Sequence, residues 1–426
     1  MGGDCLNVGC VPSKALIAAS RAGHDFPAAM ARMRKLRVRI SENDSARRFK
    51  QLGVDLFFGE GRFTDSNTIS VNEKILKFKK AAICTGARAK TLSIPGLKEA
   101  GFLTNETMFS LTDLPPRLAV IGAGPIGCEM AQTFARFHSQ VVLFAKGDQI
   151  LPREDADAAK IVANQMGKDG VSLIFNANIT RVTNQETEKV VHYRVNGIEK
   201  TVVVDAILVG VGRTPNVESL GLKQVAVKYD METGVAVNDL LQTTNPHIYA
   251  AGDVCSPFQF THTADAMAKI LIQNALFPHP FGLGLRKASD MVIPWCTYTS
   301  PEIAHVGITE SDAIKEGIEI DTFTYNLSNV DRAILDGEEA GFVRVHVEKG
   351  TDKILGATIV AVHAGEMMNE LTLAIKAGIG LKVVAETIHP YPTQAEVINK
   401  VANEWRKSIF TQQKKNILQK WFDLTR

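Results

Sequence analysis

The chain opens with the stretch that decides its fold, Gly2-Gly3-Asp4-Cys5-Leu6-Asn7-Val8-Gly9-Cys10-Val11-Pro12-Ser13-Lys14. Two cysteines lie five residues apart, directly before an apolar run typical of a helix. Residues five apart on a regular helix have Cα atoms about 8–9 Å apart, whereas a disulfide needs roughly 4.4–6.8 Å. Cys5 and Cys10 can therefore bridge only across a distorted turn, and Gly9 gives the backbone that freedom.

A thiolate in this stretch would lie near a helix N-terminus with Lys14 one turn on, and both features lower a thiol pKa. The alternative is that Cys5 and Cys10 are two buried, unpaired cysteines. The contiguous pattern G-G-x-C-L-N-x-G-C-x-P-S-K resembles the redox-active segment of the flavoprotein disulfide reductases, the family of dihydrolipoamide dehydrogenase, glutathione reductase and mercuric reductase. The resemblance implies that the cysteines cycle between disulfide and dithiol. Cys5 would meet the substrate, Cys10 would lie against the flavin, and Lys14 would lie near the flavin N5.

The composition excludes several classes of protein. A chain of 426 residues with 45% hydrophobic content can build two to four domains. A formal net charge of +2 gives no case for a nucleic-acid partner, and no apolar run reaches the length of a membrane span. One catalytic disulfide with the remaining cysteines buried as thiols fits the cytoplasm or another reducing compartment. Those four are Cys84, Cys128, Cys255 and Cys296.

A second motif begins at residue 117. An apolar strand, 117–121, runs straight into Gly122-Ala123-Gly124-Pro125-Ile126-Gly127, and a helix at 128–137 and a strand at 140–144 follow. In this setting G-x-G-x-x-G predicts a dinucleotide site, with the pyrophosphate at the helix N-terminus. The alternative is a glycine-rich turn in an ordinary α/β domain.

The residues after the strand at 140–144 indicate whether the nicotinamide cofactor is NADH or NADPH. An acidic residue there would hold the ribose 2′-hydroxyl of NAD, but this chain has Ala145 and Lys146. A missing carboxylate and a nearby cation favour the 2′-phosphate of NADPH, with NADH as the second choice. Lys146 as a plain surface lysine is the alternative.

The resemblance also implies residues for both cofactors. For FAD these are Gly3, Lys14, Gly61, Thr85, Gly86, Asp253, Thr261 and His262. For the nicotinamide cofactor they are Gly122, Gly124, Ile126, Gly127, Glu129, Lys146 and Gly212. Glu129 would pair with Lys14, and Asp253 would accept a hydrogen bond from a flavin hydroxyl. We assign no metal site.

The predicted fold is α/β, with two Rossmann-like nucleotide-binding domains and an α+β dimerisation domain that implies a homodimer. The expected ranges are 1–113 and 237–288 for the FAD domain, 114–236 for the NAD(P)H domain, 289–409 for dimerisation and 410–426 for a basic amphipathic helix. Strands are expected at 54–59, 68–71, 341–347 and 354–362, and a helix at 366–377.

The sequence departs from the family pattern at its start. Members of the family have a strand, a G-x-G-x-x-G turn, a helix and a second strand before the Gly-Gly pair, and this chain begins at the pair. Those elements hold the FAD pyrophosphate. We therefore expect an FAD domain that is incomplete at its N-terminus and binds little FAD.

A second departure lies near the C-terminus. The family motif H-x-H-P-T-x-x-E, which supplies an acid/base histidine to the partner subunit, here reads His389-Pro390-Tyr391-Pro392-Thr393-Gln394-Ala395-Glu396. Tyr391 occupies the catalytic histidine position, Glu396 matches the glutamate, and His389 is a possible substitute. Mercuric reductases also have a tyrosine there, but they carry a C-terminal cysteine pair. The last cysteine here is Cys296, so Hg(II) reduction is unsupported.

The C-terminal region is basic and amphipathic. Val397, Val401, Trp405 and Ile409 recur every four residues, and beyond them lysines accompany Ile417, Leu418, Trp421 and Phe422. This pattern is consistent with packing on the protein's own surface or with contact to a membrane surface.

The function implied is an oxidoreductase that passes electrons from NADPH, through FAD and the Cys5–Cys10 disulfide, to an unidentified small-molecule acceptor. One alternative is a flavin reductase of quinones or other small oxidants that does not use the dithiol. Another is a truncated nucleotide-binding paralogue without activity.

Overall fold

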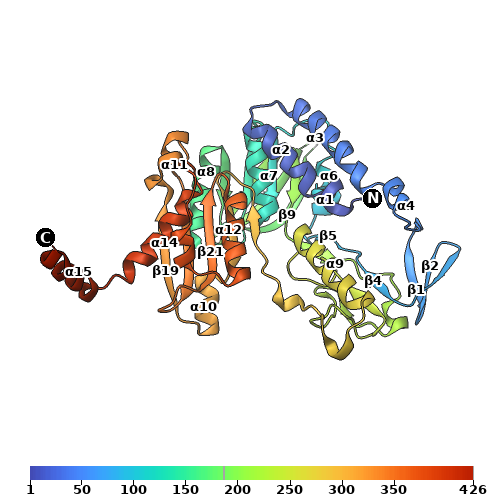
Figure 1. Ribbon diagram of the computed structural model, residues 1–426. Helices are drawn as coiled ribbons and strands as arrows, with labels where there is room; N and C mark the ends of the chain where they lie inside the picture. Colours follow the sequence, from blue (N-terminus) through green and yellow to red (C-terminus); the bar gives the residue numbers. More distant parts are fainter. Residues whose placement is uncertain (186–187, 426) are drawn as a thin grey trace. The chain divides into compact units, whose positions relative to one another are not determined.

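The computed structural model describes residues 1–185 and 188–425 (Figure 1). Two compact units are present: residues 1–148 with 170–291, and residues 149–169 with 292 onward. The predicted α/β class is confirmed. Residues 149–169 fall inside the range expected for the NAD(P)H domain, yet they group with the second unit.

A four-stranded parallel sheet forms the nucleotide-binding part of the first unit. Its order is β12 (Ala206–Val209), β6 (Arg117–Ile121), β7 (Gln140–Phe144) and β8 (Val171–Ile174). Helix α7 (Pro125–Arg136) connects β6 to β7. Strand β6 is almost continuously apolar and buried, as expected where helices cover a parallel sheet. An antiparallel sheet, β9 (Asn178–Gln185), β10 (Glu188–Val195) and β11 (Ile198–Val204), follows β8.

The two expected parts of the FAD domain meet through short strand pairs. Strand β4 (Ala81–Ile83) pairs in parallel with β16 (Ile248–Ala250), and β5 (Ala87–Ala89) pairs with β13 (Arg213–Pro215). Further elements are α1 (Gly3–Asn7), α2 (Cys10–Arg21), α3 (Phe26–Ser41), α4 (Ala46–Gln51), β1 (Gly61–Asp65), β2 (Thr68–Val71), β3 (Lys74–Lys77) and α9 (Thr261–Leu276). Residues 1–113 and 237–288 therefore contribute to the same unit.

Two expectations from the sequence are wrong. No strand forms over 54–59 within the described chain; Val54 and Phe58 are exposed there, because these residues have no partner strand, and the first strand begins at Gly61. Of the four cysteines expected to be buried thiols, only Cys128 is buried. Cys84 is exposed because it follows β4, which pairs on one side only, and Cys255 and Cys296 are half-buried.

The second unit is built on a five-stranded sheet. Its order is β17 (Trp295–Thr297), β18 (Glu302–Gly307), β21 (Ile354–Ala361), β20 (Phe342–Glu348) and β19 (Ile320–Asn326). Strands β20 and β21 and helix α12 (Ala364–Ala377) lie within two residues of the expected bounds. The other helices are α8 (Ala156–Lys168), α10 (Glu310–Glu316), α11 (Asp331–Asp336), α13 (Leu381–Glu386), α14 (Glu396–Ser408) and α15 (Gln412–Thr425).

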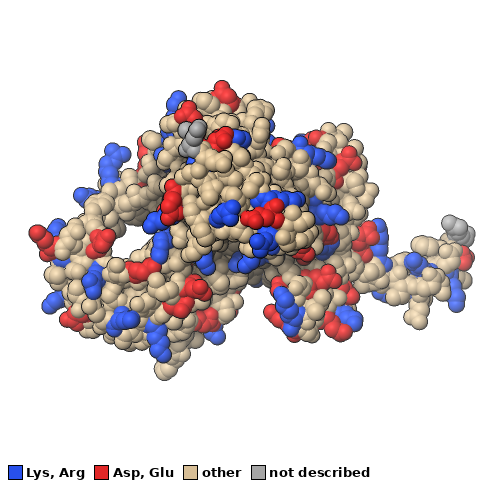
Figure 2. Space-filling model, turned by 180° about the vertical axis from the view of Figure 1, so that it is seen from behind, with Lys and Arg blue, Asp and Glu red and all other residues tan. Residues whose placement is uncertain are grey.

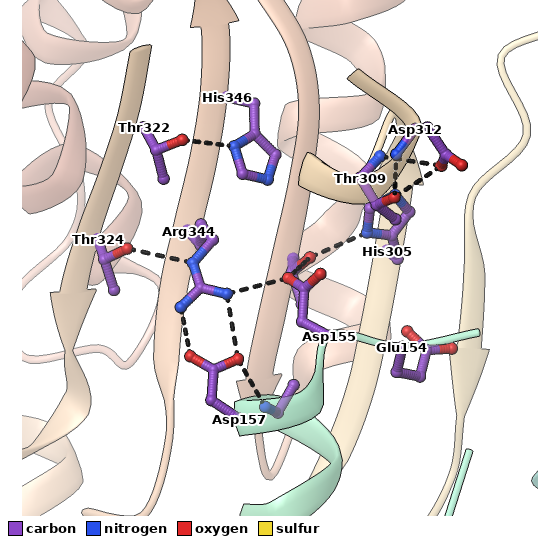
Figure 3. A network of polar contacts seen from close by, with 12 residues as sticks. Glu154, Asp155, Asp157, His305, Thr309, Asp312, Thr322, Thr324, Arg344 and His346 are labelled. Atoms are coloured by element: carbon purple, nitrogen blue, oxygen red, sulfur yellow. Dashed lines mark hydrogen bonds and ion pairs between the residues drawn. The ribbon is translucent and has the colours of Figure 1, made fainter. Parts of the chain in front are cut away.

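Alternation along the strands gives this sheet two different faces. Val343, Val345 and Val347 of β20 belong to an apolar core with α12 and α14. Arg344 and His346, between them, point to the opposite face, where residues at the start of α8 lie (Figure 3). One face is therefore a hydrocarbon core and the other a polar network.

The polar network joins α8 to the sheet. The Arg344 guanidinium donates to Asp155 at 3.0 Å and contacts Asp157, and it holds the pKa of the Asp157 carboxyl below its usual range. His305 shares a 2.9 Å hydrogen bond with Thr358. Buried charges need such partners, because an unpaired ion in the interior is costly. These contacts explain why residues 149–169 group with the second unit.

His346 is fully buried beside Arg344, and among the described residues its Nε2 has no hydrogen-bond partner. Its Nδ1 lies 2.8 Å from the Thr322 hydroxyl. Burial lowers the pKa of His346 to about 4. The neutral ring is therefore the form that the fold accommodates.

None of the helices in 1–185 and 188–425 has both the length and the apolar character that crossing a bilayer demands.

We predict that His346 makes stability fall with acid. The unfolded state binds a proton below the ordinary histidine pKa near 6.5, whereas the folded state binds it only near 4. The difference in the free energy of unfolding between wild type and His346→Gln should therefore decrease by up to about 3 kcal/mol as the pH falls from 7 to 4. Urea unfolding across this range measures it, with exposed His247→Gln as control. A difference that stays constant with pH would contradict the prediction.

Candidate active site

The helix break at Val8 and Gly9 shapes the site. Helix α1 ends at Asn7 and α2 begins at Cys10, so the predicted distorted turn between the cysteines is confirmed. A Cβ on Gly9 would lie 2.9 Å from the Asp4 carbonyl oxygen and 3.2 Å from the Cys5 Cα. Only glycine leaves room for so close an approach of the two helix ends, and this approach brings the cysteines together.

The two cysteines are present as thiols, and each changes the pKa of the other. The hydrogen bond with Cys10 and burial raise the pKa of Cys5. The hydrogen bond from Cys5, helped by the Thr261 hydroxyl and the Lys14 charge against the cost of burial, lowers the pKa of Cys10 to about 6. The Cys10 sulfur lies 3.7 Å from the Thr261 Oγ1. The two shifts have opposite directions and favour the thiolate on Cys10 over the thiolate on Cys5.

Lys14 and Glu129 form an ion pair beside the cysteines. The Lys14 Nζ lies 2.8 Å from the Glu129 Oε2, and the Glu129 side chain is only 5% exposed. Lys14 lies one turn after Cys10 on α2, and Glu129 lies on α7. The predicted pairing of these two residues is confirmed. It ties the redox helix to the helix that follows the glycine-rich turn.

A second ionic group, centred on Arg213, was not predicted from the sequence. Arg213 contacts the carboxylates of Asp4 and Asp253, its Nε lying 3.3 Å from Asp253, and it also donates to the Ala87 carbonyl oxygen. Burial raises the pKa of Asp253. Position 213 follows the Val211-Gly212 turn, which was the signal available in the sequence. Arg213 and Asp4 therefore join the candidate site.

The glycine-rich turn has room for a dinucleotide. A Cβ on Gly127 would lie 1.9 Å from the Gly122 carbonyl oxygen, so the turn packs tightly there. A Cβ on Gly124 would meet nothing within 4 Å. Gly124 therefore leaves open space at the N-terminus of α7, where backbone N–H groups suit a pyrophosphate. Lys146 is exposed directly after β7, and Ile126 is 37% exposed.

The residues assigned to FAD fit the cofactor in part. The Gly86 Cα faces open space, and the buried Thr263 Oγ1 has no partner within the described residues. However, the Thr85 hydroxyl donates to the Asn216 carbonyl oxygen at 2.7 Å, so its side chain is already engaged. His262 stacks on Phe260, and Gly61 is exposed at the start of β1. The flavin-ring end of the predicted site, with Lys14, Thr261 and Asp253, is the better formed.

The C-terminal residues of the prediction lie in the second unit. Tyr391 is 68% exposed and donates to Asp331 at 2.9 Å. Glu396 pairs instead with Lys400 at 2.8 Å. The His389 Nε2 lies 3.1 Å from Glu370, and its Nδ1 lies 3.1 Å from the Thr387 carbonyl oxygen.

Tyr391 and Glu396 therefore have different partners in this structure. Helix α11 brings Asp331 to the phenol, while Glu396 lies one turn before Lys400 on α14 and is neutralised there. Both His389 ring nitrogens are engaged, and its side chain is 7% exposed. Asp331 was not identifiable from sequence, because it lies 60 positions from Tyr391.

Comparisons with known proteins point to the same family as the sequence motifs. The family model described as pyridine nucleotide-disulphide oxidoreductase matches residues 1–268, and its dimerisation-domain model matches 293–402. The chain is 33% identical to a mercuric reductase of Lysinibacillus sphaericus, over 96% of this chain and 77% of that protein. It is also 33% identical to a dihydrolipoyl dehydrogenase of Mycoplasma pneumoniae, over 96% and 91%. Among solved structures, a Cu(II) complex of the HOCl-induced flavoprotein disulfide reductase RclA from Escherichia coli matches with a TM-score of 0.87 at 28% identity, covering 94% and 91%.

We predict that Cys10 is the more reactive thiol at neutral pH. Its alkylation by iodoacetamide, followed by mass spectrometry of the peptides, should rise with an apparent pKa of about 6, while Cys5 reacts only at higher pH. Cys5→Ala and Thr261→Val, which each remove a hydrogen-bond donor, should each move the Cys10 transition to higher pH. Thr261→Ser, which keeps the hydroxyl, should restore it. Preferential labelling of Cys5 at pH 7 would show that the thiolate is on the other sulfur.

Proposed function

This chain belongs to the pyridine nucleotide-disulphide oxidoreductase family, and we propose that it uses the Cys5–Cys10 dithiol to reduce a small acceptor with electrons from NADPH. It is an NAD(P)H-dependent flavoprotein oxidoreductase of the disulfide reductase type, and its dimerisation domain supports a homodimer. One observation supports the role of the dithiol most directly. The Cys10 sulfur is held by Cys5 and Thr261, next to the Lys14–Glu129 pair.

The residues that would hold the cofactors follow from the fit described above. Lys14, Thr261 and Asp253 would face the flavin end of FAD, and the open space at Gly124 with exposed Lys146 would take the nicotinamide cofactor. Bound FAD and NADPH would supply the two electrons that return the Cys5–Cys10 disulfide to the dithiol. The chain's own part is to keep Cys10 as a thiolate and Cys5 as a thiol.

The dithiol delivers two electrons per cycle. Oxidation of the Cys5 thiol and the Cys10 thiolate to one disulfide forms an S–S bond and releases two electrons and one proton. Two Cu(II) ions would accept one electron each, with the proton going to solvent, whereas a quinone would accept both electrons, this proton and a second proton from solvent. A disulfide acceptor would instead form two new thiols and needs a group that protonates the leaving sulfur.

Tyr391 favours a metal ion or a quinone over a disulfide as the acceptor. In the family motif a histidine stands at this position, and a histidine near neutral pKa exchanges protons readily at pH 7. The hydrogen bond to Asp331 raises the pKa of the Tyr391 phenol, which makes it a still weaker acid. We therefore propose a metal ion or a quinone as the acceptor. The Cu(II) complex of the structural neighbour supports the metal-ion class.

We predict a preference for NADPH that depends on Lys146. One charge-assisted contact to the 2′-phosphate contributes roughly 1.5–3 kcal/mol, or about 10- to 150-fold in kcat/KM. Lys146→Glu should therefore remove or reverse the preference in FAD-reconstituted protein. Steady-state kinetics with NADPH and NADH measure it, with Lys98→Glu as a matched exposed-lysine control. Equal kcat/KM values of wild type for NADPH and NADH would contradict the assignment of Lys146 to the 2′-phosphate.

We predict that Tyr391 sets the acceptor class. Wild type should turn over Cu(II) or a quinone faster than lipoamide, and Tyr391→His should raise lipoamide reduction because an imidazole can protonate the leaving sulfur. In Asp331→Asn the carboxylate no longer raises the pKa of the Tyr391 phenol. The loss of acceptor turnover at alkaline pH should therefore begin at a lower pH than in wild type. Rapid lipoamide reduction that survives Tyr391→Phe and is lost in His389→Gln would transfer the role to His389.

A further inference from the structure

Helix α15 presents an apolar face that no part of the described chain covers. None of its residues 412–425 is buried, and Ile417, Trp421, Phe422 and Leu424 are 53–84% exposed. The preceding helix differs, because Val397, Val401 and Trp405 of α14 lie in the core of the second unit. The expected packing on the protein's own surface therefore applies to α14 and not to α15.

The residues of α15 separate by type around the helix. At about 100° per residue, the apolar side chains fall on one side, which also includes Lys414 in the first turn and Thr425 at the end, and most uncharged polar side chains, with the single acid, fall opposite. The apolar side holds Ile417, Leu418, Trp421, Phe422 and Leu424, and the polar side holds Gln412, Asn416, Gln419 and Asp423. Lys415 and Lys420 lie at the two borders between these faces. Border lysines can cover apolar surface with their stems while their ammonium groups reach outward.

The charge around this helix is strongly one-sided. Residues 406–425 carry five cations and one acid: Arg406, Lys407, Lys414, Lys415, Lys420 and Asp423. Lys407 pairs with Glu404 at 2.7 Å, whereas within the part of the chain that the structure describes no ion pair involves the three lysines of α15. Lys414 donates to the Ile409 carbonyl oxygen at 3.0 Å. Figure 2 shows the C-terminal segment at the right with lysines beside uncharged surface. A negatively charged surface is the complement of such a helix.

We propose that α15 docks the protein on an anionic lipid surface. The apolar face would enter the boundary between headgroups and acyl chains, and Lys415 and Lys420 would lie at the lipid phosphates. Trp421 and Phe422 suit this depth, where aromatic rings are favoured. The same helix of a second copy is a poorer occupant, since it brings like charges together and 14 residues make a short helix for a coiled coil. The docking does not depend on the chemistry at Cys5 and Cys10.

The test is co-sedimentation of the full chain with vesicles of phosphatidylcholine alone or mixed with phosphatidylglycerol. Wild type should bind the mixed vesicles and bind much less to the neutral ones. Lys415→Gln with Lys420→Gln should weaken binding to mixed vesicles by about 25-fold, taking about fivefold for each lysine. The matched control, Lys200→Gln with Lys223→Gln, removes the same charge from exposed positions elsewhere. It should bind like wild type.

A second pair of measurements addresses the apolar face. Trp421→Ser with Phe422→Ser should abolish binding without loss of fold, because α15 buries nothing; circular dichroism checks the fold. Trp421 fluorescence should shift to the blue with mixed vesicles, and Trp421→Phe should lose that shift. Equal binding to neutral and mixed vesicles, or no binding to either, overturns the proposal. So does an oligomeric state that changes in Trp421→Ser with Phe422→Ser while wild type ignores vesicles, since that result assigns the face to a second copy.

Discussion

The ion pair between Lys14 and Glu129 is the contact on which the first unit depends. It spans 115 positions of sequence at 2.8 Å and buries the Glu129 carboxylate almost completely. A carboxylate so buried must be matched by a cation, and removing one partner of such a pair commonly costs several kcal/mol. The pair therefore holds α2, which carries the cysteines, against α7, which begins at the glycine-rich turn. It brings the redox stretch and the dinucleotide stretch into one site, and it also places a positive charge near Cys10.

Several further contacts hold the residues of the site around the Lys14–Glu129 pair. Gly9 brings the two cysteines together, Thr261 supplies a hydroxyl to Cys10, and Arg213 links Asp4 to Asp253. Each contact joins elements far apart in sequence. Of these contacts, those with Cys5 and Thr261 lower the pKa of Cys10, and the thiolate is the nucleophilic form of a cysteine.

The five-stranded sheet of the second unit has one apolar face and one polar face. One face packs hydrocarbon against α12 and α14, while the other meets α8 through Arg344, Asp155 and Asp157. Since α8 lies between β7 and β8 in the chain, this polar face connects the sheet to the segment that leaves the dinucleotide-binding strands. His346 is buried on the same face, and burial lowers its pKa. On the apolar side, α14 completes the core, and α15 extends beyond it with its own apolar face uncovered.

Local patterns were sufficient to predict much of this protein. The cysteine stretch and the glycine-rich turn between β6 and α7 follow from contiguous motifs, whose geometry depends on neighbours in the chain. The pairing of Lys14 with Glu129, 115 positions apart, was implied by the family resemblance and not by local geometry. Other features depend on how distant elements pack. Tyr391 bonds to Asp331 rather than to Glu396, Arg213 joins two carboxylates, and residues 149–169 associate with the second unit. In each case several partners of the right charge exist in the sequence. Which one is within reach is set by the direction in which a helix or strand presents its side chain, and that direction is known only once the elements have packed.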